Sequence, residues 1–362
     1  MPVSTEAKTP RQLGYRMPAE WEPHEATWLA WPHNPEDWPG KFSAIPWLYA
    51  EIVRLLAERE RVHLIVEDAA TERRVIGMLE RGCANLDAVI FHRWPTDRGW
   101  TRDSGPIFVR NASGKIALTN WRFNGWAKYD DWHLDAKLPG RVTKLLGLLN
   151  WQPLVENQNG AKPCVLEGGS IDVNGAGTLL TTEECLLSDV QRRNPGISRE
   201  QLERVFRDYL GIDQVIWLGR GIAGDDTHGH VDDIARFASP ATIIAASEPN
   251  KNDPNHAPLA ENLKTLRSAR TLDGKQFTVI ELPMPRPIVF RRQRVPASYA
   301  NFYIANGVVL MPTFHDPNDR VALNILAEAF PHREVIGVHC VDLIWGLGAL
   351  HCMTQQQPAP GR

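Results

Sequence analysis

Cys352 stands in a segment where a cysteine could act as a nucleophile. Two glycines, Gly346 and Gly348, precede it on a predicted loop that follows the apolar run 335–345. Glycines adopt backbone angles closed to other residues, so a substrate can approach such a loop closely. Because the thiolate is the reactive form of cysteine and can form covalent intermediates, we predict that Cys352 is the nucleophile of a covalent mechanism.

A histidine and a carboxylate two residues apart could supply acid–base chemistry. His230 and Asp232 open a segment, residues 231–237, that we predict to be a strand after an acidic turn at 224–227. Side chains two apart on a strand share one face, so this pair would lie on one surface. Histidine exchanges protons near neutral pH, whereas an ionised carboxylate can hold a cation. The alternative is a surface histidine and aspartate at the start of a strand.

Two more carboxylates occur beside features that are typical of binding sites. Asp103 follows Trp100 in a predicted turn before a strand, so the carboxylate could grip a guanidinium through two parallel hydrogen bonds while the indole stacks on the cation. Glu167 precedes two glycines and could orient His230, which would fix the tautomer of the ring and raise its basicity. The alternatives are a structural pair of Asp103 with Arg102, a tryptophan in the core and a simple turn at Glu167.

The histidines and acids from 228 to 233 are also similar to the start of a metallohydrolase ligand set. His228, His230, Asp232 and Asp233 offer ligand atoms, but no second histidine follows the acidic pair, and the later histidines form no obvious ligand pair. We therefore expect no metal and no other cofactor, and we keep a metal-dependent hydrolase as an alternative.

The composition favours a small cationic ligand over a macromolecular one. The net charge of the 362 residues is −3 and both signs are mixed, with no basic block to neutralise a phosphate backbone, so we expect no nucleic-acid partner. No apolar run approaches the length of a membrane span, and residues 1–16 lack the apolar core of a secretion signal. The five cysteines are spread and never spaced Cys-x-x-Cys, which favours reduced thiols. We therefore expect a cytoplasmic protein without membrane contact.

The elements that must position these residues form a unit of hairpin, helix and strand that recurs along the chain. Hairpins are predicted at 107–118, 171–180 and 302–310. The second and third are followed by a helix and a strand, at 198–210 and 214–218 and at 319–330 and 335–338. Further pieces are predicted at 27–31, 47–59 and 62–66, and another copy would begin at 230–239 and 242–246. About five α/β units of this kind could close into a propeller-like ring with a site on its axis, and one ordinary α/β sheet is the alternative.

Motifs spread over nearly the whole chain resemble those of the agmatine deiminase family, in the bacterial peptidylarginine deiminase-type group of guanidino-group-modifying enzymes. They follow one another in the order of that family, which is more specific than any one motif. The matching segments are 17–24, 28–32, 100–106, 124–126, 167–169, 224–237 and 351–356.

The resemblance implies an α/β pentein fold, in which five pseudosymmetric ββαβ units surround a central, metal-free active site. It implies one catalytic domain over 1–362, with an N-terminal extension at 1–16 and a short tail at 357–362. The implied reaction hydrolyses agmatine, a small guanidino cation, to N-carbamoylputrescine and ammonia, as in putrescine biosynthesis. A homodimer or larger homo-oligomer is the implied assembly.

The resemblance also assigns roles to individual residues. Cys352 would be the nucleophile, His230 the general acid and base, and Glu167 the partner of the histidine. Asp103 and Asp232 would clamp the guanidinium. The remaining pocket residues would be Trp100, Trp126 and Asp226, with Asp226 a candidate for the far amine of the substrate.

Two departures from the family pattern leave the choice of substrate open. His228 stands where many relatives have Asn or Asp, and the segment 345–350 is bulkier than the glycine-rich loop often found before the cysteine. Because such loops read the far end of a substrate, the alternatives include deimination of peptidyl-arginine, free arginine or another small guanidine. An amidine transferase would need the same side chains, and a non-catalytic binding ring is the alternative outside enzymes.

Overall fold

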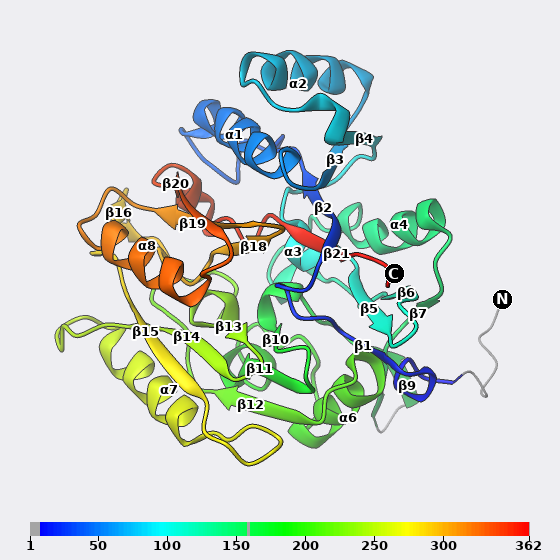
Figure 1. Cartoon of the computed structure of the whole chain (residues 1–362), viewed down its shortest axis with the longest axis vertical. Helices are drawn as coiled ribbons and strands as arrows, with labels where there is room; N and C mark the ends of the chain where they lie inside the picture. Colours follow the sequence, from blue (N-terminus) through cyan, green and yellow to red (C-terminus); the bar gives the residue numbers. More distant parts are fainter. Residues whose placement is uncertain (1–7, 158–159, 362) are drawn as a thin grey trace.

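Five mixed sheets with the same order of elements make up most of the described chain, which in this computed structural model comprises residues 8–157 and 160–361 (Figure 1). In each sheet a first strand pairs antiparallel with a second, the chain then passes through a helix, and a third strand pairs parallel with the second. The units succeed one another around the centre of the view in the order of the sequence. The recurring hairpin, helix and strand predicted from the sequence are therefore present.

The first unit joins the two ends of the chain. Its elements are β21 (Gln355–Pro358), β2 (His24–Ala30), α1 (Ile45–Ala57), β3 (Arg61–Val66), α2 (Ala69–Arg81) and β4 (Val89–Arg93). Trp28 of β2 pairs with Gln355 of β21 on one side and with His63 of β3 on the other. The strand–helix–strand pieces predicted at 27–31, 47–59 and 62–66 are confirmed with shifted ends.

Both predicted terminal boundaries need correction. Gln357 and Pro358, which we assigned to a tail, belong to β21, because backbone pairing with β2 orders this polar segment. Tyr15 and Arg16, which we assigned to an N-terminal extension, form β1 (Tyr15–Arg16) and pair with β5 (Ile107–Asn111). Such pairing depends on strands far away in the sequence, so no local pattern indicates it.

The second and third units follow the same order. The second contains β5, β6 (Ile116–Thr119), α4 (Leu138–Leu146) and β7 (Asn150–Trp151), and is preceded by the one-turn helix α3 (Thr101–Ser104). The third contains β10 (Asp172–Val173), β11 (Thr178–Thr182), α5 (Glu183–Leu186), α6 (Arg199–Leu210) and β12 (Gln214–Leu218). The short pair β8 (Leu154–Asn157) and β9 (Gly160–Pro163) lies between them in the sequence.

Helix α6 shows how the sequence sets the ends and the buried face of such a helix. The Ser198 hydroxyl accepts a hydrogen bond from Gln201 N, and the Gln201 side chain accepts one from Ser198 N, which is the predicted capping box. Leu202 and Phe206 recur at helical spacing and are buried against the sheet. Gly211 ends the helix with a φ of 71°, a conformation that glycine adopts without strain.

The fourth and fifth units complete the set. Their elements are β13 (Ala235–Ser239), β14 (Thr242–Ser247), α7 (His256–Ser268) and β15 (Thr278–Pro283), then β18 (Tyr303–Ala305), β19 (Val308–Thr313), α8 (Asn318–Ala329) and β20 (Glu334–His339). A small hairpin of β16 (Val289–Phe290) and β17 (Gln293–Arg294) lies between the two units in the sequence. Leu56 of α1 and Leu310 of β19 belong to one buried apolar cluster, so the first and last units share a core.

The strand predicted at 231–237 is partly wrong. Val231–Asp233 forms a 3₁₀ turn, η7, and the strand begins only at Ala235. His230 therefore precedes a tight turn and Asp232 lies within it, so the alternation of a strand does not describe their directions. Aspartates such as Asp232 and Asp233 favour turns over strands. The predicted strand begins too early because apolar residues follow them.

Among the residues that the structure describes, no helix combines the length and apolar character needed to cross a membrane.

Candidate active site

Cys352 lies beside a cavity of about 270 Å³ where several units meet. It follows the 3₁₀ turn η8 (Leu343–Gly346) and is only 7% exposed. Asp103 and the pocket residues Trp100, Trp126 and Asp226 line the same cavity, so it brings together residues from distant segments. The other lining residues are Glu36, Asp37, Pro39, Arg98, Tyr129, Thr227, Gln293, Trp345, Gly346, Leu347 and Gly348.

Asn301 holds the nucleophile in place. Its Oδ1 accepts hydrogen bonds from the backbone nitrogens of His351 at 3.0 Å and Cys352 at 3.4 Å. Its Nδ2 lies 3.1 Å from Cys352 Sγ and 2.9 Å from Asp233 Oδ1, so the amide donates to the sulfur. We did not predict this residue, because an asparagine just before a hairpin is ordinary and nothing local links it to a cysteine 51 positions later.

His230 is buried among acids. Its Nε2 lies 3.6 Å from Glu167 Oε2 and its Nδ1 lies 3.9 Å from Asp103 Oδ1. Burial alone would lower the pKa of His230, but Asp103, Cys185 and Glu167 raise it well above its ordinary value. The groups around the imidazole therefore favour its protonated form.

Glu167 is itself held ionised. Arg193 Nε donates to Glu167 Oε1 at 3.1 Å inside the protein. Although burial would raise the pKa of this carboxyl, Arg193 and His230 lower it below its ordinary value. The predicted meeting of Glu167 with His230 is present, and Arg193 is an addition that sequence reasoning missed.

Cys185 forms a compact group with Glu167 and His230. One ligand atom of each residue lies within 4.8 Å of the others, and all three residues are buried. A thiol, an imidazole and a carboxylate are ligand types that Zn²⁺ accepts, although the nearby guanidinium of Arg193 opposes a cation. His228 is not part of this group: its Nε2 lies 3.0 Å from Ser188 Oγ.

Asp103, Asp232 and His230 lie close together beside Gly169. A Cβ atom on Gly169 would lie 2.6 Å from His230 Nδ1, 2.8 Å from Asp103 Oδ1 and 3.1 Å from Asp232 Oδ2. Only glycine leaves room at this point, so the Glu-Gly-Gly motif has a packing reason. The two carboxylates and the imidazole therefore surround one small region.

The Asp103 carboxylate is fixed by two donors. Trp126 Nε1 donates to Oδ2 at 2.9 Å, and Gly169 N donates to Oδ1 at 3.0 Å. Burial raises the pKa of Asp103 to about 6, against the lowering effect of His230 and with the help of Asp232. The alternative of a structural pair with Arg102 is not realised, since Arg102 bonds to Gln356 and Glu20 instead.

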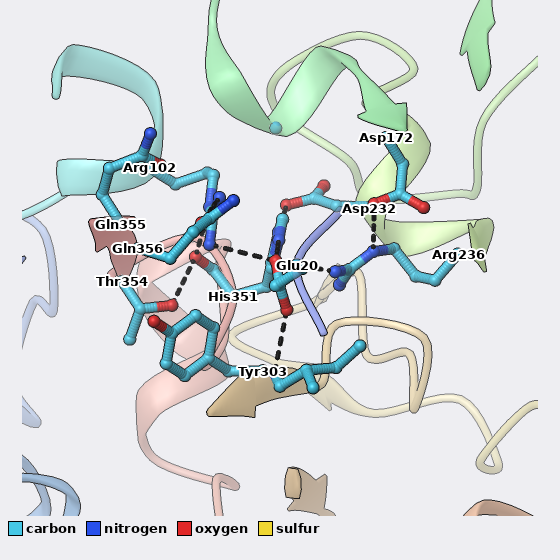
Figure 2. A network of polar contacts seen from close by, with 12 residues as sticks. Glu20, Arg102, Asp172, Asp232, Arg236, Tyr303, His351, Thr354, Gln355 and Gln356 are labelled. Atoms are coloured by element: carbon cyan, nitrogen blue, oxygen red, sulfur yellow. Dashed lines mark hydrogen bonds and ion pairs between the residues drawn. The ribbon is translucent and has the colours of Figure 1, made fainter. Parts of the chain in front are cut away.

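A buried network of charges holds Asp232 (Figure 2). Asp232 Oδ2 accepts from His351 Nδ1 at 2.7 Å and lies 3.7 Å from Cys352 Sγ. Burial would raise the pKa of Asp232, but the hydrogen bond and charge of His351 lower it. On its other side His351 meets Glu20, which lies between Arg102 and Arg236. His351, supported by Glu20, therefore orients the Asp232 carboxylate and favours its ionised form.

Burial and the neighbouring carboxylates favour the protonated thiol at Cys352. Burial, followed by Asp232, Asp233 and Asp103, raises the pKa of Cys352 well above its ordinary value. A cation among these acids would offset their charge and favour the thiolate.

The remaining predicted pocket residues lie on the walls of the cavity. Trp100 packs on Trp38 with ring centroids 5.4 Å apart. Asp226 accepts from the Tyr129 hydroxyl at 2.7 Å and pairs with Lys128. Of the two departures from the family pattern, the loop before Cys352 does line the cavity, where Leu347 has a φ of 69°. His228 is not among the lining residues.

Comparisons with known proteins match the whole architecture. The family model of the Porphyromonas-type peptidyl-arginine deiminases matches residues 16–358. The agmatine deiminase of Ectopseudomonas mendocina is 35% identical over 99% of both chains. The structure of the Enterococcus faecalis agmatine deiminase superposes with a TM-score of 0.87 at 30% identity, over 98% of both chains. A C. jejuni agmatine deiminase with substrate bound gives 0.83 at 29% identity, over 96% of this chain and 97% of the other.

The fold and the buried cysteine, histidine and acids place the chain among the α/β deiminases. It belongs to the Porphyromonas-type peptidyl-arginine deiminase family.

Proposed function

We propose that this protein is an agmatine deiminase, a hydrolase that converts agmatine and water to N-carbamoylputrescine and ammonia. The observation that carries the proposal is the position of Cys352 Sγ, 3.7 Å from the Asp232 carboxylate and beside a cavity that Asp103 also lines. Two carboxylates next to a nucleophile fit a planar cation with nitrogens on both sides. The similarity to agmatine deiminases over nearly the full chain supports the same conclusion.

Binding of the guanidinium would convert the Cys352 thiol to the reactive thiolate. Asp103 and Asp232 pair with the outer nitrogens, and Trp100 offers a ring for the cation to stack on. Trp126 acts on the substrate through Asp103, to which its indole donates. The arriving positive charge lowers the pKa of Cys352, whose thiol proton leaves to solvent, and the Asn301 amide donates to the thiolate.

The reaction then proceeds through a covalent intermediate. The Cys352 sulfur bonds to the central guanidinium carbon, and the protonated His230 gives its proton to the nitrogen that leaves as ammonia. A water molecule loses a proton to His230 and attacks the thiouronium carbon. The carbon–sulfur bond then breaks, the added hydroxyl gives its proton to the departing sulfur as the ureido carbonyl forms, and Cys352 is regenerated as a thiol. Glu167 holds His230 in place through both steps.

Several broader expectations belong to this proposal. We propose that the five units form a pentein α/β-propeller and one catalytic domain, with a C-terminal strand that closes the ring. The polyamine pathway, through putrescine biosynthesis, is the proposed context. A homodimer or larger assembly and a cytoplasmic location stay predictions.

A metal-dependent hydrolase is the second candidate, because Glu167, Cys185 and His230 form a group that could hold an ion. The two candidates separate in one assay. Purified protein is dialysed against a chelator and given agmatine, free arginine and a peptidyl-arginine in parallel, and ammonia and ureido products are measured. Turnover of agmatine that survives the chelator supports the deiminase. Activity lost to the chelator and restored by Zn²⁺ supports the metal enzyme. Activity on another guanidine alone would mean that this compound, and not agmatine, is the substrate.

A further inference from the structure

A buried carboxylate with an unused oxygen lines the catalytic cavity. Asp37 lies on the loop between β2 and α1, and its side chain is only 2% exposed. Arg98 Nη1 donates to Asp37 Oδ1, whereas Oδ2 is buried and has no hydrogen-bond partner among the residues that the structure describes. A buried carboxylate oxygen without a donor is costly, so this position is suited to a ligand that brings one.

The Trp100 ring packs against both glycines of the loop before the nucleophile. A Cβ atom on Gly348 would lie 3.1 Å from the Cys352 Cβ and 2.8 Å from the Trp100 ring. A Cβ atom on Gly346 would lie 3.1 Å from the same ring and 2.4 Å from Trp38 Nε1. Asp37, Trp100 and Cys352 all line the same cavity. A ligand that reacts at Cys352 and fills this cavity therefore has Asp37 among the residues around it.

The charges around this part of the cavity favour a cation. Of the lining residues beyond the clamp, three are carboxylates, and Arg98 is the basic one. The carboxylates are Glu36, Asp37 and Asp226. Asp131, which does not line the cavity, also pairs with Arg98 and so offsets part of the positive charge of Arg98.

Asp226, the residue predicted to meet the far amine, is already engaged. Lys128 pairs with its Oδ1 and the Tyr129 hydroxyl donates to its Oδ2. Both oxygens thus have donors within the protein, and one of those donors is an ammonium group. Asp37 is the carboxylate of the two that lacks a donor on one oxygen.

We propose that Asp37 binds the far ammonium of the substrate and makes the site select guanidino compounds that end in a primary amine. The inference rests on the proposed function and names its specificity residue. An ammonium group at Asp37 donates to Oδ2 and offsets the charge of the acidic wall. Free arginine carries a carboxylate at the same end, which Asp37 and Glu36 repel. The cavity thereby distinguishes agmatine from the amino acid that differs from it by one carboxyl group.

The test compares two substrates that differ only at the far end. Agmatine carries the ammonium, and butylguanidine has the same guanidinium and carbon chain without it. For Asp37→Asn, kcat/KM on agmatine should fall at least about tenfold through KM, the usual cost of removing a hydrogen bond to a charged group. Activity on butylguanidine should stay within about twofold, since it never used the Asp37 charge. Asp131→Asn is the matched control, because it removes the other carboxylate partner of Arg98 outside the cavity lining.

Three results would overturn the inference. Asp37→Asn could keep its kcat/KM on agmatine, or it could lose activity on both substrates alike. In the third case, Asp226→Asn would lose activity selectively on agmatine while Asp37→Asn would not. Calorimetry on Cys352→Ala measures binding separately from turnover. In that background, adding Asp37→Asn must weaken the binding of agmatine and leave the binding of butylguanidine unchanged. If the wild type binds agmatine through Asp37 but releases no ammonia from it, the proposed function fails and the inference stands.

Discussion

His351 Nδ1 lies 2.7 Å from Asp232 Oδ2, and the other ring nitrogen of His351 lies 2.8 Å from Glu20 Oε2. His351 therefore bridges the two carboxylates through its two ring nitrogens. The residue next to the nucleophile thus orients the proposed clamp and helps to keep it ionised.

Loss of His351 should weaken the clamp at acidic pH. Without its charge and hydrogen bond, the pKa of Asp232 rises, since both lower it in the native site. In His351→Gln the acid limb of the kcat/KM profile for agmatine should move to higher pH, with thermal melting followed alongside. His332→Gln changes an exposed histidine and should keep the native profile. An unshifted acid limb in a folded His351→Gln protein would exclude this positioning role.

Asn301 should matter to the reactivity of the sulfur. Its amide donates to Cys352 Sγ at 3.1 Å, and removal of this donor leaves the thiolate facing the acids alone. We expect Asn301→Ala to lower kcat at least about tenfold, in line with the loss of one hydrogen bond to a charged group. The pH dependence of Cys352 alkylation by iodoacetamide should shift to higher pH in the same variant. Unchanged alkylation and kcat would show that Asn301 only shapes the backbone.

Protonation of Asp103 should make the activity on agmatine fall at acidic pH. Its pKa is raised to about 6, and only the ionised form can pair with a guanidinium. Activity on agmatine should therefore be fully developed above this pH and should fall as the pH drops through about 6, because protonation removes the charge of the clamp. Asp103→Asn should lose most activity at every pH. A wild-type kcat/KM that stays flat between pH 7 and pH 5 would contradict this assignment.

Gly169 should accept no side chain. A Cβ atom there would lie 2.6 Å from His230 Nδ1 and 2.8 Å from Asp103 Oδ1, closer than real contacts allow. Gly169→Ala should lower kcat by at least about a hundredfold, because small displacements of reacting groups are costly. Gly140→Ala in α4 is the control, since a Cβ atom meets nothing within 4 Å there. Comparable kinetics for the two variants would mean that the site relaxes around the methyl group.

The parts of the fold that depend on neighbouring residues could be predicted from the sequence. The capping box at Ser198, the helix that follows it and the recurring hairpins rest on local patterns, and the structure has them. The 3₁₀ turn at Val231–Asp233 could not be separated from the strand after it, because apolar residues follow both. The pairing of β21 with β2 depends on opposite ends of the chain.

Some residues of the candidate site could likewise be predicted from the sequence, and others could not. Asp103, Glu167, His230 and Cys352 stand out because their residue types suit the chemistry and glycine or tryptophan accompanies them. Other side chains around them carry no such signal. Asn301, Arg193 and Cys185 become visible only when the fold brings them to the sulfur, the carboxylate and the imidazole.

The most direct test of the account is ammonia release from agmatine by Cys352→Ala, with chelator present and Cys340→Ala as the matched control. Cys340 is also buried but is not among the residues that line the cavity. We predict that Cys352→Ala loses at least about a thousandfold in kcat, as expected for removal of a covalent nucleophile, while Cys340→Ala keeps near-native turnover. Turnover by Cys352→Ala within about tenfold of the wild type would contradict covalent catalysis at this cysteine.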